Sequence, residues 1–187
     1  MNDRAGGSAI VRRVGEGSLN HAFDLPRTFL VRSEETGGSL TQWIENVPAG
    51  AGPPMHVHHR EQELFRILSG QFRFWCAGDA VDLSDGDTVV IPSGAHHTFK
   101  NVGTGEGQLL ITMTPGGAEG FFEEVEAQGL HPSRDMPQIV EIAARYGVEF
   151  VGPPPAYITS QVPYWRIMQS RVELFVCARR YSITSSA

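Results

Sequence analysis

The chain has 187 residues, a formal net charge of −6 and two cysteines, Cys76 and Cys177. The length fits one domain with a sizeable core, and the acidic balance without a basic cluster argues against a nucleic-acid partner. No apolar stretch approaches the length of a membrane span, the N-terminal region lacks the apolar core of a signal peptide, and two distant cysteines do not form a disulfide framework. We therefore expect a cytoplasmic protein that binds neither a membrane nor nucleic acid.

Short apolar segments alternate with turns over the first two thirds of the chain. We expect strands at residues 28–32, 40–47, 63–68, 71–76, 88–91, 97–102 and 109–114. Glycine-rich turns divide them, and the last, GTGEG at residues 103–107, lacks the Lys-Ser/Thr of a phosphate loop, so we expect it to be a hairpin turn. Many short strands with regular turns predict an all-β sandwich or barrel.

The segment at residues 50–70, GAGPPMHVHHREQELFRILSG, places three potential metal ligands close together. Successive side chains of a strand point to opposite faces, so His56 and His58 point the same way. By the same alternation His59 faces away or lies in the following turn. Together with Glu63, the two imidazoles suit a divalent metal such as iron, manganese, nickel, copper or zinc.

A second segment, residues 86–101, reads GDTVVIPSGAHHTFKN and carries a fourth potential ligand, His97. The preceding His96 points to the opposite side by strand alternation. We therefore expect His59 and His96 to be surface groups, or groups that contact the ligands, rather than metal ligands themselves.

The two segments fit the patterns G-x5-H-x-H-x4-E-x6-G and G-x5-P-x-G-x2-H-x3-N. With both, the chain resembles a small single-domain cupin. The resemblance implies an all-β, double-stranded β-helix (jelly-roll) barrel with one divalent transition metal per chain. It implies His56, His58, Glu63 and His97 as the metal ligands. It also favours Glu63 over the rival Glu61, which stands in a polar stretch typical of a turn.

Strand alternation also predicts which side chains face the interior of the barrel. If Glu63 points inward, Phe65 and Ile67 follow it, and the positions between them face the other side. Small-molecule cavities are mostly apolar, so some inward side chains are candidates to line one.

Aromatic residues at two-residue spacing are the main candidates for the core and for the cavity wall. We expect Phe72, Phe74 and Phe99 to belong mostly to the barrel core, with one or two of the inward aromatic rings lining a substrate cavity. Trp43 and Trp75 are alternative lining residues, and the sequence does not rank them.

After residue 116 the apolar period changes to that of a helix. We expect helices over residues 117–128 and 136–146, with Asp135 capping the second helix and Gly147 ending it. This part is similar to the C-terminal part of many small cupins, which implies a short helical extension packed outside the barrel.

Three consecutive prolines at positions 153–155 form a stiff connector. We therefore divide the chain into residues 1–152, the cupin barrel with its N-terminal strands and C-terminal helices, and residues 153–187, a tail outside that domain. Residues 156–187 hold four arginines and one glutamate and either cross to a partner subunit or have no function. We expect a homodimer.

The complete three-His-one-Glu set on a single barrel resembles that of the quercetinase-like dioxygenases. The resemblance implies oxygen-dependent chemistry on a small enolisable or hydroxylated aromatic or dicarbonyl compound. In this interpretation Glu63 is both a metal ligand and the catalytic proton acceptor. Two alternatives stay open: a metal-dependent isomerase or lyase, and a non-catalytic cupin that binds a small molecule.

Overall fold

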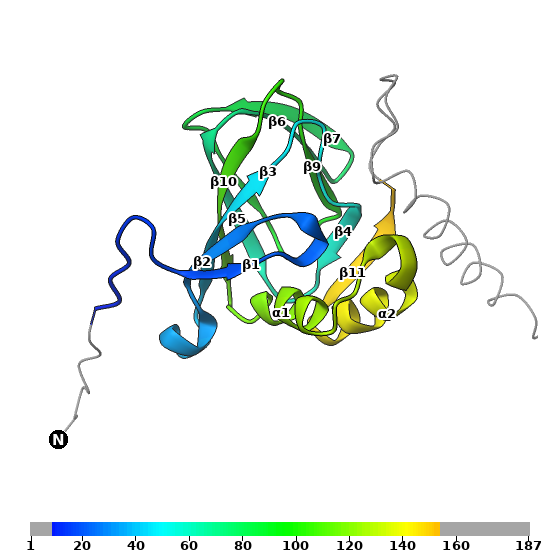
Figure 1. The fold of residues 1–187 in the computed structure, drawn as a ribbon. Coiled ribbons are helices and arrows are strands. Elements are labelled where there is room, and N and C mark those ends of the chain that lie inside the picture. The colour runs from blue at the N-terminus through cyan, green and yellow to red at the C-terminus, as the bar shows by residue number, and fades with distance from the viewer. Residues whose placement is uncertain (1–8, 154–187) are drawn as a thin grey trace, which may run out of the picture.

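The computed structural model describes residues 9–153, which form two facing β-sheets with two α-helices at one end (Figure 1). The first sheet has the order β1-β2-β3-β10-β5-β8, and the second has the order β11-β4-β9-β6-β7. Every strand pair within the described residues is antiparallel. This architecture confirms the predicted double-stranded β-helix.

The first sheet contains six strands, which are β1 (Ser18–Asn20), β2 (Arg27–Val31), β3 (Thr41–Val47), β10 (Gly107–Thr114), β5 (Gln62–Ser69) and β8 (Thr88–Ile91). The second contains five strands, which are β11 (Val148–Gly152), β4 (Met55–His58), β9 (His97–Asn101), β6 (Gln71–Cys76) and β7 (Asp79–Ser84). Short 3-10 turns, η1 (Ala22–Asp24) and η2 (Ser33–Thr36), flank β2.

All seven predicted strands are present, with ends that differ from the prediction by at most two residues. β1, β7 and β11 were not predicted. For β4, the sequence predicted that His56 and His58 share one face of a strand but gave no bounds for that strand. In β7 nearly every residue is exposed, so the strand lacks the apolar alternation that identifies the others. It forms because Ala77 and Gly78, both with positive φ, make a two-residue turn that returns the chain alongside β6.

The segment at residues 103–107 is not the hairpin turn that the sequence suggested. A hairpin joins two strands that pair with each other, whereas β9 pairs with β4 and β6 and β10 pairs with β3 and β5. The segment instead carries the chain from one sheet to the other. The buried Asn101 holds it by donating from Nδ2 to the carbonyl oxygens of Val47 (2.8 Å) and Gly105 (2.9 Å).

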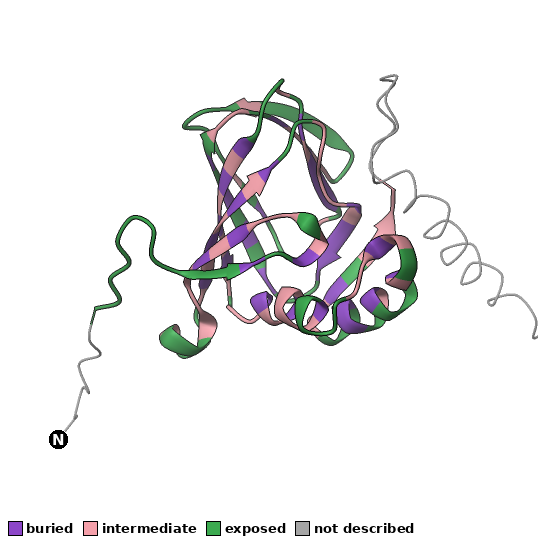
Figure 2. Ribbon diagram, viewed as in Figure 1, coloured by how far each residue is buried: buried purple, intermediate pink, exposed green. Residues whose placement is uncertain are grey.

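The main hydrophobic core lies between the two sheets (Figure 2). Phe65 and Ile67 are buried and the alternate Leu64 and Leu68 are exposed, which confirms the predicted faces of β5. Burial of a side chain of this size contributes roughly 1.5–3 kcal/mol. Three further predicted core residues belong to the same cluster, Phe72, Phe74 and Phe99.

Both predicted helices are present, as α1 (Glu119–Ala127) and α2 (Pro132–Arg145). α2 begins earlier than predicted, at Pro132, and has a kink at Asp135, whose backbone is non-helical (φ −118°, ψ 19°). The prediction that Asp135 caps the helix is wrong, because its carboxylate accepts from the preceding His131 and not from the helix after the kink. His131 is extended and its ring Nδ1 accepts a hydrogen bond from the Ser133 N–H (3.3 Å), so His131 is the N-cap. Asp135 lies inside the first turn and accepts from the His131 N–H (2.8 Å).

The helices lie across one end of the barrel, beside β1, β2 and β11 (Figure 1). Their apolar residues form a second buried cluster together with Ala22 of η1 and Val148 of β11. The helical members of this cluster are Phe121, Val125, Ile139, Ile142 and Ala143. We call α1 and α2 together the cover. The cover reaches into the barrel interior, because the ring of Phe122 on α1 contacts that of Trp43 at a centroid distance of 5.8 Å. The extension expected outside the barrel therefore also closes the space within it.

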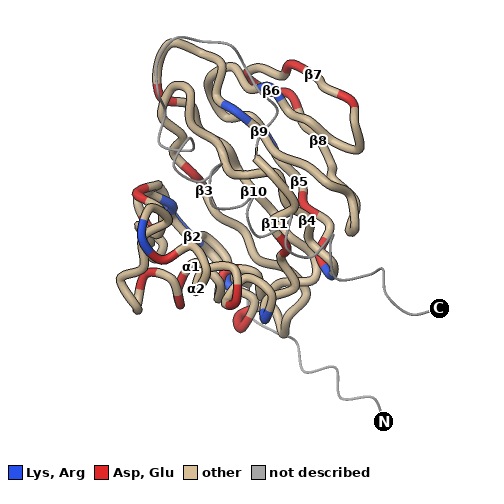
Figure 3. Tube along the Cα trace, turned by 90° about the vertical axis from the view of Figure 1, so that its right-hand side faces the viewer, with Lys and Arg blue, Asp and Glu red and all other residues tan. Residues whose placement is uncertain are grey.

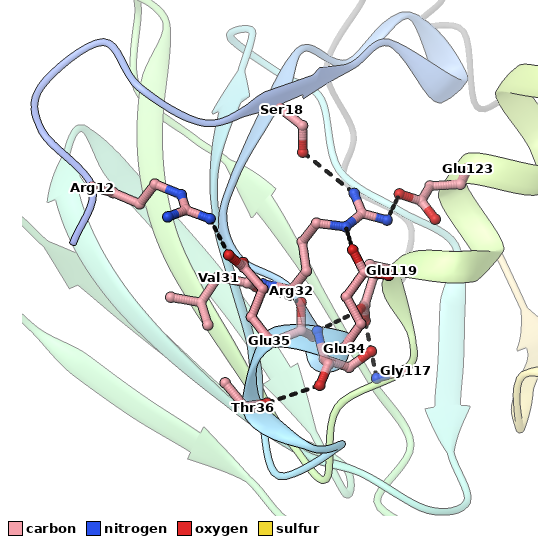
Figure 4. Close-up of polar contacts among 12 residues, drawn as sticks. Arg12, Ser18, Val31, Arg32, Glu34, Glu35, Thr36, Gly117, Glu119 and Glu123 are labelled. Carbon is pink, nitrogen blue, oxygen red and sulfur yellow. Dashed lines mark hydrogen bonds and ion pairs between the residues drawn. The ribbon is translucent and has the colours of Figure 1, made fainter. Parts of the chain in front are cut away.

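Polar contacts attach α1 to the barrel wall (Figure 4). Arg32, just after β2, pairs with Glu123 of α1 and with Glu34 (3.3 Å), and it donates to the hydroxyl of Ser18 (3.3 Å). These contacts join the N-terminal strands to the first helix of the cover.

Glu119, at the start of α1, is buried and accepts hydrogen bonds from the backbone N–H groups of Ser33 (2.7 Å) and Gly117 (2.9 Å). Burial alone would raise the pKa of Glu119, but the hydrogen bonds from Ser33 and Gly117 lower it below the ordinary value. An ionised carboxylate at this position also favours the helix N-terminus.

Lysine and arginine positions are spread among acidic ones along the described trace (Figure 3). Within residues 9–153, no helix is long and apolar enough to cross a membrane. The proposed tail lies outside the described residues from position 154 on, so its role and the domain boundary stay predictions.

Candidate metal centre

Four side chains with metal-binding atoms converge between the two sheets. His56 and His58 lie on β4, and His97 lies on the neighbouring β9, where it is the register partner of His56. Glu63 comes from β5 of the facing sheet. All four are buried, and one potential ligand atom of each lies within 4.8 Å of those of the others. The structure thus brings together the four residues that the sequence predicts as ligands.

Backbone carbonyl groups orient two of the imidazoles. Nδ1 of His56 lies 2.9 Å from the Pro54 oxygen, and Nδ1 of His97 lies 2.9 Å from the Ala95 oxygen. Since a carbonyl oxygen only accepts, Nδ1 carries the proton in both rings. The lone pair of each neutral ring is then on Nε2, the atom available to a metal.

Glu63 faces the imidazoles of His97 and His58. Its Oε2 lies 3.0 Å from Nε2 of His97 and 3.6 Å from Nε2 of His58. If His97 is neutral with its proton on Nδ1, the lone pair of its Nε2 faces a lone pair of Glu63 Oε2 at 3.0 Å, and the two repel each other. A proton or a metal cation between Nε2 and Oε2 removes that repulsion. Three imidazoles and one carboxylate in a buried site fit a divalent transition metal.

Burial and neighbouring charges tune the three histidines differently. Burial, followed by the charges of His97 and His58, lowers the pKa of His56 well below its ordinary value. The pKa of His58 is also lowered, chiefly by burial. Burial would lower the pKa of His97 as well, but the hydrogen bond and charge of Glu63 raise it. Burial therefore favours the neutral form of His56 and His58 that metals require, whereas Glu63 favours the protonated form of His97, and a metal would compete with that proton.

Glu61 is a buried carboxylate that sequence reasoning placed only in a turn. It does lie between β4 and β5, but its side chain faces inward and its Oε2 is 3.8 Å from Nδ1 of His58. Neither atom has a hydrogen-bond partner among the described residues. Glu61 thus lies beside Nδ1 of His58 but outside hydrogen-bond distance, whereas carbonyl groups accept hydrogen bonds from Nδ1 of His56 and His97. The two-residue spacing from Glu63 was the signal that could have revealed it.

The other two histidines near the motifs point away, as predicted. The side chain of His59 is 54 % exposed and pairs with Glu149 of β11 at 3.0 Å. His96 is exposed in the segment before β9. Neither belongs to the buried cluster.

A cavity of about 380 Å³ adjoins the cluster and is lined by His56, His58 and Glu63. Exposed lining residues at Asp24, Pro48 and Ala49 mark where it meets the solvent. Its aromatic lining comes from the barrel and from the cover and includes Trp43, Phe99, Phe121, Phe122 and Phe150. Among the two candidate tryptophans, Trp43 lines the cavity and Trp75 does not. The volume and apolar walls suit a small molecule.

One ion pair interrupts this apolar lining. Arg27 of β2 and Glu45 of β3 are buried register partners, and Nε of Arg27 donates to Oε2 of Glu45 at 3.3 Å. The indole N–H of Trp43 donates to the same oxygen at 3.1 Å. Sequence reasoning missed this pair. Its only signal was that Glu45 shares strand parity with Trp43.

Comparisons with known proteins agree with the fold. Residues 43–113 match the family model described as a cupin domain. The chain therefore contains a cupin domain, and the buried His and Glu residues form a possible metal site in its barrel.

Two curated relatives match part of the chain. Quercetin 2,3-dioxygenase from Bacillus subtilis (strain 168) is 25 % identical over 117 residues, which cover 63 % of this chain and 34 % of that protein. An uncharacterized protein from Methanocaldococcus jannaschii is 28 % identical over 69 residues, which cover 37 % of this chain and 55 % of that protein. The chain thus spans about a third and about half of the lengths of these relatives.

Solved structures show the same fold. A predicted oxalate decarboxylase from Thermotoga maritima superposes with a TM-score of 0.51 at 22 % identity, covering 56 % of this chain and 98 % of that one. An RmlC-like cupin from Shewanella frigidimarina NCIMB 400 superposes with a TM-score of 0.50 at 18 % identity, covering 60 % and 96 %. At these identities the likeness concerns the fold alone.

Proposed function

We propose that this chain is a metal-dependent dioxygenase that acts on a small enolisable or hydroxylated aromatic or dicarbonyl compound. The observation that carries the proposal is the buried three-His-one-Glu cluster beside a largely apolar cavity. The similarity of 117 residues to a quercetin 2,3-dioxygenase supports it. The proposed cofactor is one divalent transition metal per chain, held by His56, His58, Glu63 and His97.

A bound divalent metal supplies Lewis acidity toward an enol, phenol or carbonyl oxygen of the substrate. The chain's residues then have two tasks, to take up a proton and to hold the rest of the molecule. Because the metal identity follows from availability as much as from the ligand set, iron, manganese, nickel, copper and zinc are all candidates.

Glu63 is the proposed proton acceptor. Its Oε2 faces the imidazoles, whereas its Oε1 forms no hydrogen bond with any residue in the described range. Since Glu63 lines the cavity, this second oxygen is available to the hydroxyl or enol proton of a substrate. The apolar walls limit the access of water, which strengthens electrostatic contacts within the cavity.

Aromatic side chains hold the remainder of the substrate. Phe99 lines the cavity from β9, the strand that also carries His97, and Phe122 lines it from α1. Flat, largely apolar molecules match such walls because they bury much surface at little polar cost.

Metal analysis of protein purified without a chelating tag, followed by an oxygen-electrode screen of flavonols and β-dicarbonyls, tests the proposal. We expect about one divalent ion per chain and oxygen uptake that requires it. Conversion at an equal rate without oxygen would replace the dioxygenase with an isomerase or lyase. Tight binding without turnover would indicate a non-catalytic binding protein.

The proposed enzyme is a cytoplasmic homodimer that binds neither nucleic acid nor membranes. Light scattering of the purified chain tests the oligomeric state, and a monomer at all concentrations would reject it.

A further inference from the structure

The ion pair of Arg27 and Glu45 lies in the same cavity as the candidate metal ligands but at a different place on its wall. Both Glu45 and Glu63 flank β10, on opposite sides of it. Glu63 pairs with Met113 of that strand, whereas Glu45 pairs with Leu109, four positions away. A ligand that fills the cavity from the cluster onward therefore meets a second polar site.

Glu45 has one oxygen that the protein uses and one that it does not. Oε2 accepts hydrogen bonds from both Arg27 and Trp43. Oε1 accepts none from the described part of the chain, although the residue is only 6 % exposed and lines the cavity. Oε1 is not among the fully buried unpartnered atoms of the described residues, so it is accessible from the cavity, where a hydrogen-bond donor of a ligand can reach it.

Arg27 is held too firmly to turn toward the ligand itself. Its Nη1 donates to Asn20 Oδ1 (2.7 Å) and to the Ala22 oxygen (3.2 Å), and its guanidinium carbon lies 3.9 Å from the ring centroid of Phe122. Because Arg27 already compensates the charge of Glu45, the ligand need not be a cation. A neutral hydroxyl group, which donates one hydrogen bond, is sufficient.

We propose that Glu45 is a specificity-determining residue whose Oε1 accepts a hydrogen bond from a hydroxyl group of the substrate, remote from the oxygens that reach the metal centre. The inference rests on the proposed function for the metal-binding end of the molecule. The substrate class is therefore an elongated, mainly aromatic compound with chelating oxygens at one end and a hydroxyl group at the other.

Two flavonols that differ by one hydroxyl group on the distal ring test this assignment. Each is titrated against the zinc-loaded protein without oxygen, and binding is followed by flavonol absorbance. The wild-type chain should bind the hydroxylated flavonol about tenfold to a hundredfold more tightly, the effect of one hydrogen bond to a charged acceptor.

Glu45→Gln should abolish this preference. Arg27 and Trp43 are both donors, so they keep the amide oxygen of the variant in the place of Oε2, and the amide nitrogen, a donor, then faces the cavity. Glu45→Asp keeps the charge that Arg27 requires but withdraws the carboxylate, and it should reduce the preference to less than about threefold. Asp82→Asn, at an exposed pair with Arg73, is the matched control and should retain the full preference.

Circular dichroism and zinc content show whether each variant is folded. If Glu45→Gln is not folded, Glu45→Asp alone tests the inference. An equal preference in wild type and in the Glu45 variants would overturn the inference. Failure of the wild type to bind either flavonol would overturn it together with the proposed substrate class. A hydroxyl preference in this titration, combined with no oxygen uptake in the separate oxygen-electrode screen, would reject the dioxygenase and leave the role of Glu45 in place.

Discussion

Glu45 and Glu63 are two buried carboxylates on one sheet, and their surroundings differ. Glu45 is compensated within the protein by the guanidinium of Arg27 and by the indole N–H of Trp43. Glu63 faces the imidazoles of His97 and His58. Nδ1 of His97 donates to a backbone carbonyl group, and Nδ1 of His58 lies near Glu61. Glu45 has a permanently charged partner, whereas the nearest partner of Glu63 is the titratable His97, so the comparison indicates that one end of the cavity is complete and the other can accept a cation from outside.

The largest expected effect is the loss of metal from the Glu63 end. A His56→Ala/His97→Ala double variant removes two of the four proposed ligands, so metal content should fall from about one ion per chain to nearly none. Elemental analysis measures it. A His59→Ala/His96→Ala variant is the control, since both residues lie outside the cluster. Full metal content in the first double variant would contradict the ligand assignment.

A second effect concerns the stability of the Glu45 end. Arg27→Met should lower the free energy of unfolding by about 3–5 kcal/mol, because it leaves Glu45 buried without its cation. In metal-free protein, Glu63→Gln should change the free energy of unfolding by about 1 kcal/mol or less, because its partner His97 is titratable and can become neutral, so no uncompensated charge stays buried. Urea unfolding of both variants decides the comparison, and equal losses would contradict it.

A smaller effect is expected at Glu61. Glu61→Gln keeps the size of the side chain, but Arg60 donates to the other carboxylate oxygen, so the amide oxygen should stay with Arg60 and a donor should replace the acceptor near Nδ1 of His58. Removing such a partner typically lowers metal affinity by about tenfold to a hundredfold. Competition with a zinc indicator measures the affinity, and an unchanged value would show that Glu61 does not orient His58.

The smallest effect lies far from both carboxylates, in the cover. Glu119→Gln should destabilise the protein by about 1 kcal/mol at neutral pH, because it loses the charge that Ser33 and Gly117 stabilise. The folded pKa of Glu119 is lowered, so its contribution is complete above the ordinary carboxylate pKa and is lost as pH falls through the folded value. The difference between wild type and variant should therefore begin to shrink as pH falls below the ordinary carboxylate pKa of about 4.3, and it should disappear below the lowered folded pKa. A constant difference down to strongly acidic pH would exclude this origin.

Strand alternation explains why much of the barrel could be predicted from the sequence. In β5 the period of two puts Glu63 and Phe65 on one face, and the structure has both of them buried. The two motif segments likewise identified all four members of the His and Glu cluster. What the sequence could not supply is which loops return beside which strand. That is why residues 103–107 were assigned to a hairpin although they connect the two sheets.

The polar partners of the cavity were missed for a different reason. Arg27 and Glu45 are eighteen positions apart and meet only because β2 and β3 pair in one register. Charged residues in strands are usually exposed, and the one local sign of burial was that Glu45 lies on the same strand face as Trp43. The capping of α2 failed on similar grounds, since a histidine took the place of the expected aspartate.

The candidate ligands belong to opposite walls of the barrel, with the histidines on one sheet and Glu63 on the other. An ion held by all four would therefore act as a cross-link between the sheets as well as a reactive centre. Its binding energy would oppose their separation, and each tenfold rise of free metal above the dissociation constant would add about 1.4 kcal/mol to the free energy of unfolding. In such a protein, metal supply would set the lifetime of the chain as well as its chemistry.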